Sequence, residues 1–135
     1  MIIDWQHHYF PESLWKKLGG KPGQVVQVLQ DGMPRLSLFE QLYRLDQQIR
    51  DMDNSGIDMA VLSCTMQSLE DARTVNDDLS KVMKDYPDRF VGVAITDPLG
   101  GQPGLDELDR AIKVLGLKGV LIESQMEGHS LRGRY

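Results

Sequence analysis

The chain has 135 residues, with 15 basic and 20 acidic side chains and a formal net charge of −5. This charge excludes a broad cationic surface, so we expect neither nucleic acid nor a membrane as a partner. No apolar run approaches the roughly 20 residues that span a bilayer, and a single cysteine, Cys64, excludes an intrachain disulfide, so we expect a cytoplasmic protein.

The first part of the chain predicts a strand and a hairpin. Residues 1–4 form a short apolar run that predicts the first strand. Farther along, Asp31-Gly32 separates two β-prone runs and is a strong signal for a two-residue turn. We therefore expect a small β-hairpin over 24–36, inserted after the first strand.

The next stretch predicts a helix followed by a buried strand. Ser37 with Glu40 three residues later is typical of a capping box, which predicts that the first long helix begins there. Gly56 predicts its end, and residues 59–64 form an apolar run typical of a strand covered on both faces. The helix carries one apolar stripe, formed by Phe39, Leu42, Leu45, Ile49 and Met52.

The same unit then repeats. Ser68 predicts the start of a second helix and Pro87 its end, and a strand follows over 90–96. A third helix over 105–115 and a fourth strand over 117–123 complete the pattern. Strands that alternate with helices predict a parallel α/β sheet with right-handed crossovers. A complete (β/α)8 barrel needs about 250 residues, which this chain does not have.

Polar residues follow the first strand, and in parallel α/β folds function gathers at the carboxyl ends of strands. On a regular strand Asp4, Gln6 and His8 share one face, and His7 lies on the other face with Ile3 and Trp5. Donors two residues apart on one face can bind the same metal ion. The residues alone also allow a structural hydrogen-bond network in this place.

Residues 2–11, Ile-Ile-Asp-Trp-Gln-His-His-Tyr-Phe-Pro, resemble the start of the amidohydrolase-related metal-dependent hydrolases. The branch they resemble is that of the aminocarboxymuconate-semialdehyde decarboxylases, whose first strand ends in Asp-x-His-x-His. Residues 52–63, 76–92 and 116–120 resemble the approaches to the family's second, third and fourth strands, in the same order. The resemblance thus covers almost the whole chain.

This resemblance implies the first four β/α units of a TIM (β/α)8 barrel, in which residues 1–135 form one partial domain. It also implies a divalent metal, with zinc expected, held by His8 and Gln6 on the first strand and by histidines and an aspartate of later strands. Gln6 departs from the family's histidine. Because an amide oxygen is a weaker zinc donor than imidazole, this departure weakens the expected site.

For the substrate, the family implies a small carboxylated molecule, with His129 and Glu123 as candidate contacts. The residues around His129 by themselves favour a surface histidine. Glu123 and Asp97 could act as acid or base, or could be solvated or cap the next helix. For Cys64 we expect a small buried residue, because no basic neighbour in sequence predicts a thiolate.

We therefore expect the N-terminal portion of an amidohydrolase-type enzyme, a hydrolase or a carboxy-lyase, that is inactive as this chain alone. Four strands of a barrel leave open edges and an uncovered face, which favour association. We expect either a homo-oligomer or a missing C-terminal half. The alternative is a non-catalytic, metal-free half-barrel that serves as an interaction module.

Overall fold

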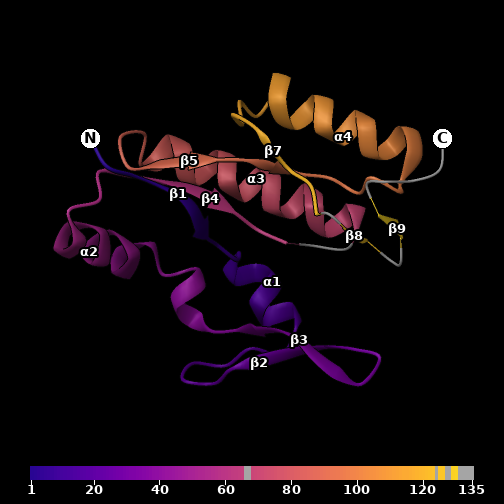
Figure 1. Cartoon of the computed structure of the whole chain (residues 1–135), viewed down its shortest axis with the longest axis horizontal. Helices are drawn as coiled ribbons and strands as arrows, with labels where there is room; N and C mark the ends of the chain where they lie inside the picture. The colour runs from indigo at the N-terminus through magenta and orange to yellow at the C-terminus, as the bar shows by residue number, and fades with distance from the viewer. Residues whose placement is uncertain (66–67, 124, 127–128, 131–135) are drawn as a thin grey trace.

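Parallel strands that follow one another in chain order form the centre of the molecule (Figure 1). The computed structural model describes residues 1–65, 68–123, 125–126 and 129–130, with only the backbone described for Gln30 and from 125 onward. One sheet has the order β1-β4-β5 and a second pairs β6 with β7, and all these pairs are parallel. The strands are β1 (Ile3–His8), β4 (Met59–Ser63), β5 (Phe90–Gly92), β6 (Ala94–Ile95) and β7 (Val120–Leu121).

The two sheets are continuous at Val93, the one residue between β5 and β6. Its N–H donates to the carbonyl of Leu62 on β4 (3.1 Å), and the N–H of Lys118, before β7, donates to the carbonyl of Gly92 (3.0 Å). The strands therefore occupy four neighbouring positions whose order never reverses. In a doubly wound sheet the order of the strands reverses partway across the sheet. An order without a reversal is that of a (β/α)8 barrel.

Three long helices connect these strands: α2 (Leu45–Ser55), α3 (Leu69–Asp85) and α4 (Gly101–Lys113). The predicted cap of α3 is confirmed, because the hydroxyl of Ser68 accepts from the N–H of Asp71 at 3.1 Å. Gly56 ends α2 with a left-handed φ of 70°. The strand predicted over 117–123 is shorter than expected, and only Val120–Leu121 pairs as β7.

The predicted helix start at Ser37 is wrong. Ser37 lies in β3 (Met33–Leu38), where it pairs with Gln27, so its backbone belongs to a strand ladder. A 3-10 turn, η1 (Glu40–Leu42), follows, and α2 begins at Leu45 without a side-chain cap. A short helix that was not predicted, α1 (Glu12–Lys17), follows β1 and buries Trp15.

The predicted hairpin is confirmed as β2 (Val26–Gln30) and β3, which pair antiparallel. Asp31 and Gly32 adopt φ values of 52° and 76°, as a two-residue turn with the twist of a hairpin requires. Figure 1 shows the hairpin projecting on the side of the sheet away from α4. Its inner face packs against the core through Val26, Val28, Leu36 and Leu38.

The core lies between the sheet and its helices, and one sheet face is left open. On the helix side, Ala60 and Leu62 of β4 and Val75 and Leu79 of α3 are fully buried. On the other side Trp5 of β1 is 77% exposed. In a barrel this second face would be the interior. The antiparallel pair β8 (Gln125–Met126) and β9 (His129–Ser130) follows β7.

Candidate active site

An irregularity in β1 decides which of its side chains face the barrel interior. Asp4 pairs with Ala60 and His7 pairs with Leu62. An advance of three residues along β1 therefore corresponds to an advance of two residues along β4. One extra residue therefore sits in β1, as in a β-bulge. The bulge places Asp4 and His7 on the same face as Ala60 and Leu62, which is the helix side.

The prediction that Asp4 shares a face with Gln6 and His8 is therefore wrong, and so is the prediction that His7 points away from Asp4. The Asp4 carboxylate and the His7 Nδ1 are 2.7 Å apart. This hydrogen bond, the largest influence on the group, lowers the pKa of Asp4 below its usual value. Asp4 and His7 thus form the structural hydrogen-bond pair that the residues alone had allowed.

Gln6 and His8 both belong to the interior side of β1. His8 pairs with Ser63, and Ser63 lines one hollow of this face together with Gln6 and Trp5. The His8 ring itself lines a second hollow, between the strand ends and β3. Both side chains are exposed. The two predicted donors are thus accessible from the interior face.

These donors do not by themselves fit a complete metal centre. Among the described residues, no group of three His, Cys, Asp or Glu side chains could hold a metal ion. A catalytic zinc normally takes three protein ligands and keeps one open position. On the interior face, the described residues His8 and Gln6 offer one imidazole and one amide oxygen, which is an incomplete set.

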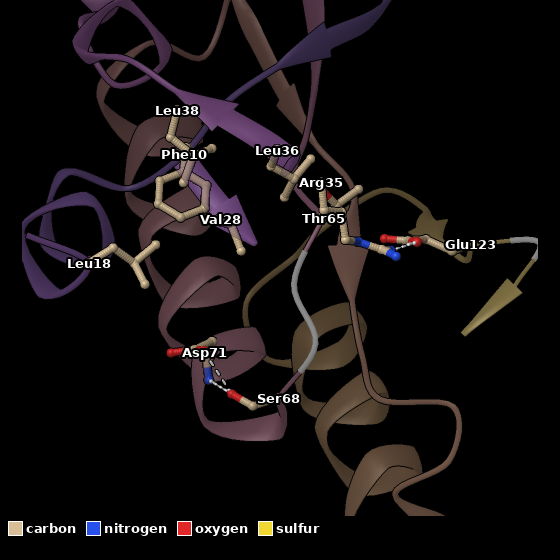
Figure 2. A pocket seen from close by; sticks show the side chains of 10 residues that line it. All are labelled: Phe10, Leu18, Val28, Arg35, Leu36, Leu38, Thr65, Ser68, Asp71 and Glu123. Atoms are coloured by element: carbon tan, nitrogen blue, oxygen red, sulfur yellow. Dashed lines mark hydrogen bonds and ion pairs between the residues drawn. The ribbon is translucent and has the colours of Figure 1, made fainter. Parts of the chain in front are cut away.

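The strand ends and the hairpin enclose a pocket of about 260 Å³ (Figure 2). Its charged boundary is an ion pair in which Arg35 Nη2 of β3 donates to Glu123 Oε2, just after β7, at 2.9 Å. Thr65, after β4, and Ser68 and Asp71 at the start of α3 complete the polar side. The apolar lining consists of Phe10, Leu18, Val28, Leu36 and Leu38, and Leu36 lies next to Arg35.

The pocket contains one of the two predicted substrate contacts. Glu123 lines it, whereas the side chain of His129 lies outside the described part, which includes only its backbone in β9. Sequence reasoning missed Arg35. An arginine inside the predicted hairpin was the available signal, but only the position of the hairpin over the strand ends places it beside Glu123.

The other strand-end residues have structural roles. Cys64 is 3% exposed, and burial raises the pKa of its thiol to about 12, which confirms the expected buried, unreactive residue. Asp97 Oδ1 accepts from the N–H of Leu99 at 2.9 Å, so this carboxylate organises the loop before α4. Neither residue lines the pocket beneath the hairpin.

Parallel strands in barrel order are the fold of part of a (β/α)8 barrel, and the pocket lies at their carboxyl ends, where such barrels place their active sites. The chain belongs to the amidohydrolase family, because the family model described as Amidohydrolase matches residues 3–135. Within the described residues, no helix combines the length and the apolar character needed to cross a membrane.

Three of the proteins that the chain resembles are decarboxylases. It is 28% identical to the 2-amino-3-carboxymuconate-6-semialdehyde decarboxylase of Dictyostelium discoideum over 96% of this chain and 42% of the relative. It is 27% identical to the gamma-resorcylate decarboxylase of a Rhizobium species over 87% of this chain and 36% of the relative. A solved structure of 5-carboxyvanillate decarboxylase from Novosphingobium aromaticivorans, complexed with manganese and 4-hydroxy-3-methoxy-5-nitrobenzoic acid, matches with 26% identity and a TM-score of 0.67, over 96% of this chain and 43% of that chain.

The chain therefore spans about two fifths of the length of these relatives, in their N-terminal part. Its fold corresponds to the first four β/α units of their TIM barrel, with a hairpin after the first strand, as predicted.

Proposed function

We propose that this chain forms one wall of the active site of a metal-dependent decarboxylase that acts on a small carboxylated aromatic compound. The observation that carries the proposal is the pocket beneath the hairpin, which combines an apolar wall with a single arginine. The gamma-resorcylate decarboxylase among the chain's relatives is named for the removal of a carboxyl group from a compound of this kind. In this proposal residues 1–135 form one partial domain.

The chemistry of the pocket supports a substrate that has a flat apolar body and a carboxylate. Phe10, Leu36 and Leu38 offer apolar contact to a ring. One nitrogen of the Arg35 guanidinium donates to Glu123, and a guanidinium can donate two parallel hydrogen bonds to a substrate carboxylate. We assign Glu123 as a substrate-side residue that holds Arg35 in place until a substrate carboxylate takes over the bond. His129 belongs to the same proposal on sequence grounds alone.

For the metal, we assign His8 and Gln6 as two of the ligands, and the remaining ligands lie outside the described residues. A divalent metal supplies Lewis-acid polarisation and a template for the substrate. Gln6 offers a hard oxygen donor, and such donors suit manganese better than zinc. The manganese in the related 5-carboxyvanillate decarboxylase supports this preference. Zinc, expected from the family resemblance, stays a prediction.

Calorimetric titration with gamma-resorcylate in the presence of manganese tests the proposal. We expect Arg35→Gln to weaken binding by about tenfold or more, because a charge-assisted hydrogen bond to the carboxylate is lost. Arg44→Gln is the matched control, since Arg44 pairs with Asp46 and does not line the pocket. Equal binding by the parent protein and Arg35→Gln would overturn the role of Arg35.

The alternative function is a metal-free interaction module, and the presence of Gln6 in place of a histidine favours it. Titrations of the same kind distinguish this module from the proposed enzyme. In the proposed enzyme, manganese alone binds to the parent protein and binds more weakly to His8→Ala. His7→Ala leaves manganese binding unchanged, because His7 lies on the helix side with Asp4. No measurable manganese binding by the parent protein at neutral pH would favour the module.

A further inference from the structure

The sheet opens at its carboxyl end between β4 and β6. Val93 is the last residue on the β5–β6 segment whose N–H reaches β4. Extending the register from Gly92 and Leu62 would make the N–H of Ile95 donate to the carbonyl of Cys64. Instead, β6 pairs only with β7. On the β7 side, the N–H of Ala94 donates to the carbonyl of Gly119 at 2.8 Å.

The side chain of Asn76 takes the place of the missing strand. Its Oδ1 accepts from the N–H of Ile95 at 2.9 Å, and its Nδ2 donates to the carbonyl of Ile95 at 2.9 Å. A neighbouring strand would satisfy the same two backbone groups of one residue. Because buried backbone groups must be paired, the sheet can open here only if a side chain supplies both bonds.

A buried carboxylate fixes the orientation of this amide. Asn76 is 0% exposed, and its Nδ2 also donates to Glu107 Oε1 of α4 at 2.8 Å. Since only the NH2 end of the amide can donate, Glu107 sets which end of Asn76 faces the N–H of Ile95. Arg110 compensates the charge through hydrogen bonds of 2.8 and 3.0 Å to Glu107.

The opening lies next to the candidate active site. A narrow hollow in the gap is lined by Cys64, Thr65, Thr96 and Glu123, among others. Thr65 and Glu123 also line the substrate pocket, and they follow β4 and β7, the strand positions on either side of β6. The position of β6 therefore sets the spacing between these two pocket residues.

We propose that Asn76 is a positioning residue: by replacing β4 beside Ile95, it holds the strand ends apart and places Thr65 and Glu123 for the substrate. This inference rests on the proposed function for the identity of the substrate. The geometry it invokes can be tested without a substrate. Asn76 acts through Ile95 and does not itself line the pocket.

The test compares Asn76→Ala with Ser80→Ala. Ser80 is a second buried polar residue of α3, and its hydroxyl donates to the carbonyl of Leu115 at 2.9 Å, away from the pocket. Both variants are expected to lose stability. Only Asn76→Ala is expected to accelerate hydrogen exchange of the Ile95 amide relative to the Ala94 amide, by about tenfold for one lost hydrogen bond. It alone should also shift the amide resonances of Thr65 and Glu123.

A titration with gamma-resorcylate and manganese adds the functional readout, with about tenfold weaker binding expected for Asn76→Ala than for Ser80→Ala. If the parent protein does not bind this probe, the proposed substrate fails, and the exchange and resonance data still decide the role of Asn76. The positioning role is overturned if both variants show the same Ile95 exchange and unchanged Thr65 and Glu123 resonances. Asn76→Ser, whose side chain is polar but too short to bond both backbone groups of Ile95, provides a second variant with the same readouts if Asn76→Ala does not fold.

Discussion

At the scale of single residues, the hydrogen-bond partners of the buried Glu107 fix the charge state of its carboxyl group. Glu107 is 2% exposed, and burial alone would raise the pKa of its carboxyl. Hydrogen bonds from Arg110 and Asn76 outweigh this effect, so the pKa lies below its ordinary value of 4.5. The ionised form is therefore the one that the fold stabilises.

This pairing predicts a loss of stability in acid. Since the folded-state pKa of Glu107 is depressed, its stabilising contribution is present above about pH 4.5 and is lost as the pH falls through the folded-state value. Urea unfolding from about pH 6 to about pH 3 should show the stability gap between the parent and Glu107→Gln shrinking with acid. Glu70→Gln, at an exposed position of α3, should give a small and nearly constant gap. A constant gap for Glu107→Gln would contradict the assignment.

The residue scale also separates what sequence could and could not predict about the site. Gln6, His8 and Glu123 could be selected from the sequence, because strand ends and a family motif select them. The hydrogen bond between Asp4 and His7 could not be predicted from the sequence. The extra residue in β1 reverses the sheet face on which the side chains before the bulge lie. The role of Arg35 could not be predicted either, because the local sequence of a hairpin does not determine where the hairpin packs on the rest of the protein.

At the scale of elements, the loop before α4 depends on a close approach of two backbones. Thr96 Oγ1 donates to the carbonyl of Gly104 at 2.6 Å, and the N–H of Gly100 donates to the carbonyl of Asp97 at 3.1 Å. A Cβ atom at Gly104 would lie 2.3 Å from the carbonyl oxygen of Asp97. The glycine is thus required for α4 to dock against the end of β6.

We therefore predict that Gly104→Ala destabilises the protein, although glycine to alanine within a helix normally stabilises by about 0.5–1 kcal/mol. Relief of the clash requires a shift of the backbone, with an expected net cost of about 1–3 kcal/mol. The free energy of unfolding in urea measures the effect. Gln102→Ala, on the exposed side of the same helix, should change it by less than about 0.5 kcal/mol. A stabilised Gly104→Ala would show that the loop moves freely.

Elements were predicted well where a pattern is local and repeated. The hairpin turn at Asp31-Gly32 and the cap at Ser68 follow from short-range chemistry, and both are confirmed. The capping signal at Ser37 failed because the antiparallel ladder with β2 satisfies the same backbone groups.

At the scale of the whole molecule, the face that a complete barrel would bury is open in this chain. Trp5 is 77% exposed, and Ile3 on the same side is also exposed. Exposed apolar surface of this kind favours association, and β1 and β7 each have an edge without a strand partner among the described residues.

We predict that this protein is not a stable monomer, and that Trp5→Ser shifts it toward the monomer, because less apolar surface is buried on association. Light scattering after size-exclusion chromatography over a range of concentrations measures the mass. Val114→Ser is the control, since Val114 is similarly exposed but follows α4, away from the open face. A monomer at every concentration would contradict the prediction.

The sequence by itself determined the family, the alternation of strands and helices, and the number of β/α units, because these depend on local periodicity and on short motifs. Only the tertiary structure decided which face of β1 carries Gln6 and His8, that Arg35 meets Glu123, and that Asn76 replaces a strand beside Ile95. These features join residues far apart in the chain. Buried polar groups must have hydrogen-bond partners, and the tertiary arrangement, not the pattern of neighbouring residues in sequence, determines which partners are within reach.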